Sequence, residues 1–136
     1  MIRTYLAIVC EGVSIDVTTG QVSIYSLLES VPVQNMPAFF PPLSFLAILT
    51  REPNDPSGPA ATLNVSLGGA HVLSAPVIVD FKNQFRTRVT VRVNGLVVTT
   101  PGVLRFSLSI LGDEVATRSV AVEMAPATAA QGAVIV

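Results

Sequence analysis

Cys10 is the only cysteine of the chain and the one side chain that could act as a strong nucleophile. A catalytic cysteine needs a nearby base and positive charge that stabilises its thiolate. Here aliphatic residues precede Cys10 and Glu11 follows it, and both surroundings raise the pKa of a thiol. We therefore interpret Cys10 as a buried structural residue.

The same stretch could also end a lipoprotein signal. Such a signal requires an apolar run longer than the one at residues 5–10, and it requires a small residue in the place of Val9. A lone cysteine forms no internal disulfide, which fits a reducing compartment. We predict a cytoplasmic location.

His71 is the only histidine, and it could serve as a general base if Asp80 or Asp113 oriented its ring. No such pairing is visible in the sequence. One cysteine and one histidine cannot supply the three or four ligands of a protein zinc site, and Asn54-Asp55 offers too few spaced carboxylates for calcium. We predict no catalytic residue, no metal site and no cofactor, and hence a protein that is not an enzyme.

Three arginines recur at even spacing in one segment. Arg86, Arg88 and Arg92 fall on the same face of a strand because side chains alternate with period two. Arg105 and Arg118 could extend this row if their strands are neighbours of the first. The row is a candidate interface for an acidic partner or for another copy of the chain. It could equally be a solvated strand face whose charges pair with carboxylates on adjacent strands.

Phe39 and Phe40 form a second candidate surface. They lie between Pro37 and Pro41 in a proline-rich segment. Two phenylalanines in a loop could anchor a partner or plug the open end of the fold. The sequence does not decide between these alternatives.

Alternation of apolar and polar residues between turn signals predicts strands throughout the chain and no amphipathic helix. Residues 31–42 predict a crossing loop or edge segment, residues 52–59 a long inter-strand loop, and Asn94-Gly95 a tight hairpin turn. The apolar segment 43–50 predicts a central strand covered on both faces. The expected strands are 5–10 with an extension to 15, 21–28, 43–50, 61–67, 71–81, 84–93, a short return at 96–98, 104–110 and 114–124.

This pattern predicts an all-β fold, an antiparallel immunoglobulin-like or Greek-key β-sandwich of about seven to nine strands. We expect one domain over residues 1–124. The small apolar residues 125–136 predict a tail docked on its own domain or on a neighbouring copy.

The composition bears on partners. Of 136 residues, 50% are hydrophobic and only 12% are charged, with a formal net charge of −1. Repulsion between such weakly charged copies is small, so self-association meets little electrostatic resistance. The nearly neutral net charge also gives no general reason to bind nucleic acid or an anionic membrane. No segment has the roughly 18–20 continuous apolar residues of a membrane-spanning helix.

The order of short motifs resembles an uncharacterised family of small bacterial β-sandwich proteins. The motifs are Cys10-Glu11, the segment 20–24 (GQVSI), the segment 40–43 (FPPL), the segment 101–106 (PGVLRF) and Gly112-Asp113 before the last strand. The resemblance implies the sandwich and brings no activity, substrate or site residue with it.

We therefore predict a non-enzymatic β-sandwich that works by protein–protein contact, including self-association as a subunit of a homo-oligomer or larger assembly. The alternative is a ligand-binding sandwich such as a carbohydrate-binding module. The absence of tryptophan and the presence of only two tyrosines disfavour that alternative, because sugar-binding platforms require exposed aromatic faces.

Overall fold

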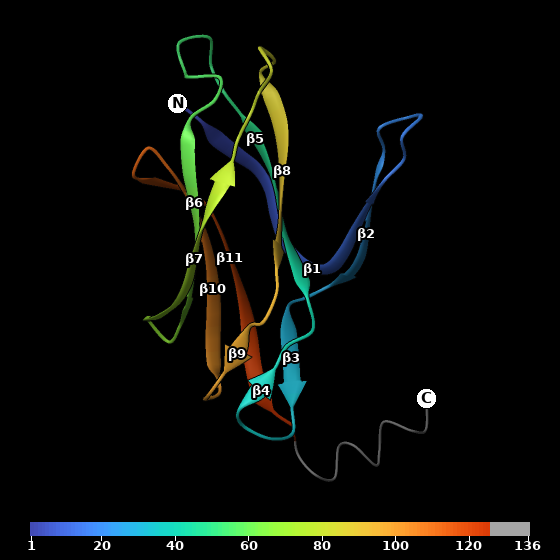
Figure 1. Ribbon diagram of the computed structural model, residues 1–136, viewed down its shortest axis with the longest axis vertical. Coiled ribbons are helices and arrows are strands. Elements are labelled where there is room, and N and C mark those ends of the chain that lie inside the picture. The colour runs from blue at the N-terminus through green and yellow to red at the C-terminus, as the bar shows by residue number, and fades with distance from the viewer. Residues whose placement is uncertain (126–136) are drawn as a thin grey trace.

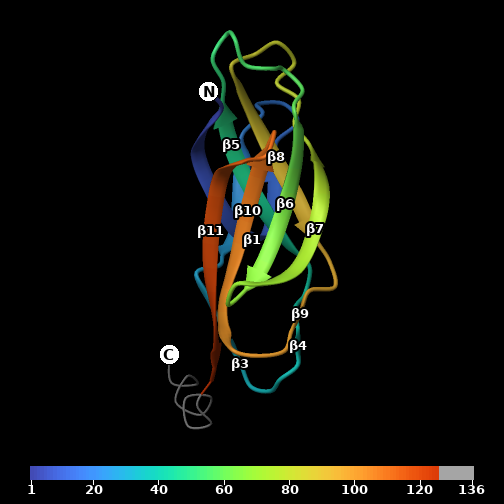
Figure 2. The same ribbon diagram turned by 90° about the vertical axis from the view of Figure 1, so that its left-hand side faces the viewer.

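The computed structural model describes residues 1–125, which fold into two β-sheets packed face to face (Figure 1). The view from the side shows the two layers, with one sheet in front of the other (Figure 2). The predicted all-β sandwich is confirmed. Within the described residues, no helix is long and apolar enough to cross a membrane.

Eleven strands make up the described fold, more than the seven to nine predicted. The four-stranded sheet has the order β2 (Val22–Leu27), β1 (Arg3–Ile15), β5 (Leu43–Thr50), β8 (Arg86–Val93). The five-stranded sheet has the order β3 (Ser30–Val33), β11 (Asp113–Met124), β10 (Gly102–Ile110), β6 (Ala60–Leu67), β7 (Ala70–Ile78). A short third pair joins β4 (Ala38–Phe39) to β9 (Val97–Val98).

Neighbours in each sheet are often distant in sequence, as Greek-key connections require. β1 pairs with β5 and β6 pairs with β10, both antiparallel. Among the strands of residues 1–125, the one parallel pair is β3 with β11, which the sequence did not predict. The segment 31–42, expected as a crossing loop or edge, supplies the extra strands β3 and β4 as it passes from one sheet to the other.

The main core lies between the two sheets. Phe45 of β5 and Phe106 of β10 stack with ring centroids 6.3 Å apart. Their neighbours at alternate positions, including Leu49 and Leu104, are fully buried. Burial of these side chains is what holds the two sheets together.

A second, smaller cluster lies on the outer face of the four-stranded sheet. It consists of Ile8, Cys10 and Leu46, with Val13 and Val22 packed against it. Since Leu46 is buried on this face and Phe45 on the other, the prediction that β5 is covered on both faces is confirmed.

The turns follow the sequence signals in one case and depart from them in another. β10 and β11 are joined at Leu111 (φ 54°) and Gly112 (φ 87°), a two-residue turn of the kind that glycine favours. The predicted Asn94-Gly95 hairpin is wrong, because β9 pairs with β4 and not with β8. The reason is burial: the residues after this turn cross to the end of the sandwich, where Leu96 and Val98 enter the core.

The predicted loop at 52–59 does connect two strands, β5 and β6. Arg51 anchors it: the side chain donates hydrogen bonds to the carbonyls of Gln84 (2.8 Å) and Asp55 (3.1 Å). Its guanidinium carbon also lies 5.6 Å and 5.1 Å from the ring centroids of Phe81 and Phe85. The predicted tail at 125–136 lies outside the described residues except for Ala125, whose N–H donates to the Val33 carbonyl (2.7 Å).

Candidate protein interface

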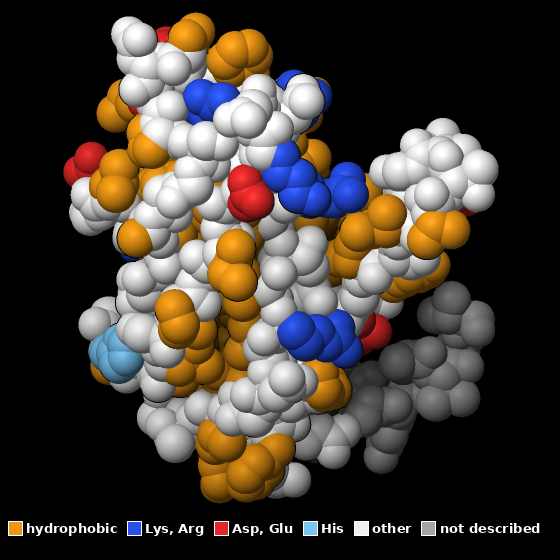
Figure 3. Space-filling view, turned by 45° about the horizontal axis from the view of Figure 1, so that its top comes forward, with side chains coloured by type: hydrophobic (Ala, Val, Ile, Leu, Met, Phe, Trp, Pro, Cys, Tyr) orange, Lys and Arg blue, Asp and Glu red, His pale blue; other side chains and the backbone are white. Residues whose placement is uncertain are grey.

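The arginine row lies on β8, an edge strand of the four-stranded sheet. Arg86, Arg88 and Arg92 are all exposed and share one face, as the period-two spacing predicts. Figure 3 shows basic side chains gathered beside the hairpin that projects from the body of the molecule. The three arginines differ, however, in what holds each of them.

Arg92 is held by the protein itself. Its Nη1 donates to the Glu11 carbonyl (2.7 Å) and to the Ser44 hydroxyl (2.9 Å). Ser44 is opposite Cys10 in the ladder, so this arginine covers the edge of the small outer cluster. We assign Arg92 a structural role.

Cys10 is fully buried in that cluster, as predicted, although on the outer face of the sheet and not in the main core. Its Sγ lies 3.4 Å from the Gly12 carbonyl oxygen. Burial raises the pKa of the Cys10 thiol, and this outweighs the opposing effects of the Gly12 contact and the Arg92 charge. The thiolate that nucleophilic chemistry requires is therefore disfavoured here.

Arg86 and Arg88 are presented to solvent. The guanidinium carbon of Arg86 lies 4.6 Å from the centroid of the Tyr5 ring, a cation–π contact that holds the side chain over β1. Within residues 1–125, no carboxylate lies within ion-pair distance of either arginine. Arg3 joins them on this face, because it is opposite Thr50, which in turn is opposite Arg86.

A shallow hollow of about 590 Å³ lies beside these two arginines, and we call it the basic hollow. Ile48 belongs to its lining, and so does Ile78, which is 91% exposed. Its charged lining residues are Asp80, Lys82, Arg86 and Arg88. The combination of apolar surface with an excess of positive charge suits an acidic chain that also carries apolar side chains.

The predicted extension of the row by Arg105 and Arg118 is wrong, because both lie in the other sheet. Arg105 forms an ion pair with Glu114, with Nη1 2.9 Å from Oε2, and the Ser107 hydroxyl donates to the same carboxylate (2.7 Å). Arg105 and the Ser107 hydroxyl hold the pKa of Glu114 below its usual range, and the Glu114 carboxylate raises the pKa of Arg105. Arg118 approaches Glu29 at 3.8 Å.

The two phenylalanines of the proline-rich segment have separate roles. Phe40 is 9% exposed and belongs to the main core, and its N–H donates to the Leu96 carbonyl (2.9 Å). Phe39 is 75% exposed and lines a groove of about 250 Å³ together with Pro32, Pro41 and other residues. Phe40 thus plugs the end of the sandwich, and Phe39 is the one free to contact another molecule.

His71 meets neither of its candidate partners. It lies at the start of β7, opposite Ser66 near the end of β6. Asp80 follows the far end of β7, and Asp113 begins β11 at that same far end of the sheet. Among the described residues, no three His, Cys, Asp or Glu side chains come together as metal ligands.

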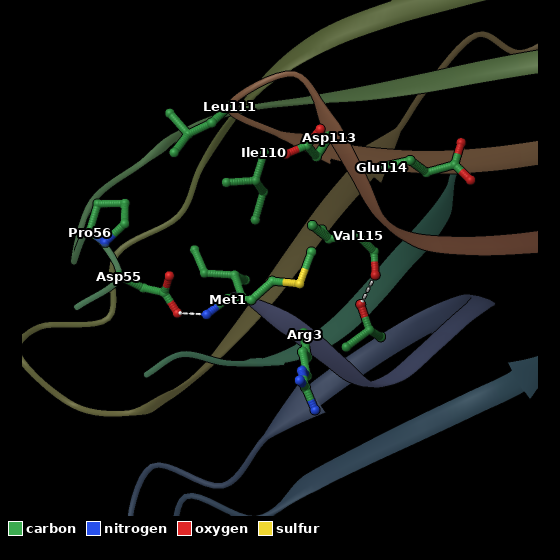
Figure 4. Close-up of a pocket in the computed structure, with 11 residues that line it drawn as sticks. Met1, Arg3, Asp55, Pro56, Ile110, Leu111, Asp113, Glu114 and Val115 are labelled. Carbon is green, nitrogen blue, oxygen red and sulfur yellow. Dashed lines mark hydrogen bonds and ion pairs between the residues drawn. The ribbon is translucent and has the colours of Figure 1, made fainter. Parts of the chain in front are cut away.

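A cavity of about 380 Å³ lies at the end of the sandwich opposite the groove beside Phe39, and the Met1 amino group binds Asp55 in its lining (Figure 4). The Met1 amino group lies 2.7 Å from Asp55 and 2.8 Å from Glu52. This contact lowers the pKa of Asp55 and raises that of the amino group. Arg3 points away from the cavity (Figure 4). The Met1 contacts therefore fasten the residues before β1 to the 52–59 loop, and we assign them a structural role.

Sequence reasoning missed Tyr5 and Arg3 as parts of the basic face. Only the β1–β5–β8 register, including the irregularity between Thr4 and Leu6, brings them beside Arg86. No local signal in the sequence specifies that register.

Comparison with known proteins agrees with the resemblance seen in the sequence. Residues 5–123 match a family of unknown function (DUF6941), and no curated protein matches the chain. Because the match covers nine of the eleven described strands completely and most of β1 and β11, the chain belongs to this uncharacterised family.

Proposed function

We propose that this protein works by protein–protein contact and that the basic face of its four-stranded sheet binds an acidic segment of another chain. The observation that carries the proposal is the pair Arg86 and Arg88, exposed beside the basic hollow with no carboxylate partner within residues 1–125. Arg105, by contrast, is neutralised by Glu114. We keep the cytoplasm as the proposed location, with which the unpaired Cys10 is compatible.

The position of β8 at the edge of its sheet favours a peptide as the ligand. An edge strand has unpaired backbone groups on one side, and an extended peptide can add to them. Alternate side chains of such a peptide lie on one face, about 6–7 Å apart, which matches the spacing of Arg86 and Arg88. A segment with carboxylates two residues apart would therefore face both arginines.

The apolar part of the hollow favours an apolar residue next to those carboxylates. Ile78 is almost fully exposed, and covering it would add hydrophobic stabilisation to the charge contacts. The stacking of Arg86 on Tyr5 limits the rotamer freedom that this side chain must lose on binding.

The size of the expected effect follows from the exposure of the charges. An exposed ion pair contributes about 0.2–1 kcal/mol, so removal of both arginines should weaken binding by about 2- to 30-fold at low ionic strength. The difference should shrink as salt is added, because exposed charges are screened.

The test is a fluorescence-anisotropy titration of a labelled peptide of about ten residues with glutamate at every second position and one central leucine. We expect weaker binding to the Arg86→Ser/Arg88→Ser double variant and unchanged binding to Arg105→Ser, the matched control on the other sheet. The proposal would be overturned if Arg105→Ser lost as much peptide affinity as Arg86→Ser/Arg88→Ser. It would also be overturned if the wild type bound a single-stranded oligonucleotide more tightly than the peptide.

A further inference from the structure

The hairpin of β1 and β2 extends beyond the rest of its sheet, and we call residues 11–27 the arm. β1 pairs with β5 only as far as Cys10, and from there to Ile15 it pairs with β2 alone. The arm projects from the sandwich as a two-stranded ribbon (Figure 1). An isolated two-stranded ribbon is marginally stable in water and gains from a further strand.

The arm exposes large apolar side chains, and Val17 at its tip is 99% exposed. Asp16 orders this tip, because its Oδ1 accepts the N–H groups of Thr18 (2.8 Å) and Thr19 (3.0 Å). The exposed large apolar residues of the arm are Ile15, Val17, Ile24, Tyr25 and Leu27. A structured hairpin that presents such residues has the character of a contact surface.

Among the edge strands of the described residues, β2 is also the one without a feature that opposes pairing with a second copy of itself. β3 contains Pro32, β7 contains Pro76, and β8 carries the exposed arginines. Proline in an edge strand opposes the addition of another strand, and like charges oppose pairing of the strand with a second copy of itself. β2 has the sequence VSIYSL, without charge or proline.

We propose that two copies of this protein associate by antiparallel pairing of their β2 strands about a two-fold axis at Ser23. The Asp16 N–H donates to the Gln21 carbonyl, so by alternation the backbone groups of Val22 and Ile24 point away from β1. With the axis at Ser23, Val22 of one copy is opposite Ile24 of the other and exchanges both backbone hydrogen bonds with it. The two four-stranded sheets then continue into each other.

A second copy fits the arm better than a charged partner does. Asp16 is the only charged residue between positions 12 and 27, and its carboxylate is occupied by its own turn. Asp16 lies beside Gln21 on the β1 side of the arm, one strand away from the pairing edge, so no like charges meet at the axis. Pairing of two β8 strands would instead bring arginines together.

The inference rests on the proposed role in protein–protein contact but uses a different surface. Ser23 would face its own copy as a non-hydrogen-bonded pair with Cα atoms about 4.5 Å apart, which is within the range of a disulfide. We expect Ser23→Cys to form a disulfide-linked dimer in a glutathione redox buffer, seen by non-reducing electrophoresis. Ser74→Cys, on edge strand β7, is the matched control and should stay monomeric on the gel, as should the wild type with its buried Cys10.

A second variant tests the pairing without a new cysteine. Ile24→Lys should convert the dimer to monomer in sedimentation velocity, whereas Val103→Lys, a change at a similarly exposed position on β10, should not. Arm pairing is overturned by a wild type that is monomeric up to about 200 μM, by equal cross-linking of both cysteine variants, or by a dimer that survives Ile24→Lys. A dimer lost in Arg86→Ser/Arg88→Ser and retained in Ile24→Lys would overturn arm pairing and leave the arginine proposal standing. A dimer lost in Ile24→Lys and retained in Arg86→Ser/Arg88→Ser supports arm pairing.

Discussion

Replacement of Phe40 by alanine should destabilise the fold far more than replacement of Phe39, although the two residues are adjacent. Phe40 belongs to the main core, and truncation of a buried phenylalanine costs about 3–5 kcal/mol in lost transfer free energy and cavity formation. Phe39 is 75% exposed. If full burial of such a side chain contributes about 1.5–3 kcal/mol, the quarter that is buried contributes about 0.4–0.8 kcal/mol.

Urea denaturation followed by circular dichroism measures this difference. With an m-value of about 2 kcal/mol/M, Phe40→Ala should lower the midpoint by about 1.5–2.5 M and Phe39→Ala by less than about 0.5 M. Phe40→Leu, which preserves most of the volume, should cost less than about 1.5 kcal/mol and serves if the alanine variant does not fold. Similar midpoint shifts for Phe39→Ala and Phe40→Ala would refute the assignment of Phe40 as the plug.

Other residues give equally direct tests of the fold. Cys10→Ser should cost about 1–3 kcal/mol in urea denaturation, because it places a hydroxyl in an apolar cluster, and the wild-type thiol should react with a thiol reagent only on unfolding. The pKa of Glu114 is lower in the folded state than its ordinary value of 4.5. The contribution of Glu114 to stability is therefore fully present above about pH 4.5 and is lost as the pH falls through the pKa of the folded state. Urea midpoints at pH 6 and pH 3 should therefore differ less in Glu114→Gln than in the wild type, and an unchanged difference would contradict the contact with Arg105. Gly112→Ala should cost about 1–2 kcal/mol in urea denaturation through its positive φ alone, since no atom lies within 4 Å of the added Cβ.

The strands and their inward faces were predictable because burial imposes a local pattern. Leu104, Phe106 and Leu108 alternate with polar residues, and this alternation places them in the core without knowledge of their partners. The segment 43–50, which is apolar nearly throughout, likewise predicts a strand with two covered faces, although not which residues cover the outer face.

Features that depend on pairing between distant strands were not predictable. Asn94-Gly95 carries the local signal of a hairpin, but the burial of Leu96 and Val98 directs the chain to β4 instead. Arg105 has the same alternation as the β8 arginines, and only the sheet order shows that it lies on the opposite side of the molecule.

The candidate interface shows the same limit. The spacing of Arg86, Arg88 and Arg92 predicts one shared face, which is correct. It cannot distinguish Arg92, which is hydrogen-bonded to Ser44, from the two arginines that have no charge partner within residues 1–125, because that difference depends on contacts between residues 48 positions apart.

Hydrogen-exchange mass spectrometry of the protein with and without the acidic peptide tests the central proposal most directly. The account predicts peptide-dependent protection of amides in β8, residues 86–93, with no change in β10, and loss of this protection in Arg86→Ser/Arg88→Ser. Protection confined to β10 or to the groove beside Phe39, or no protection at saturating peptide, would contradict it.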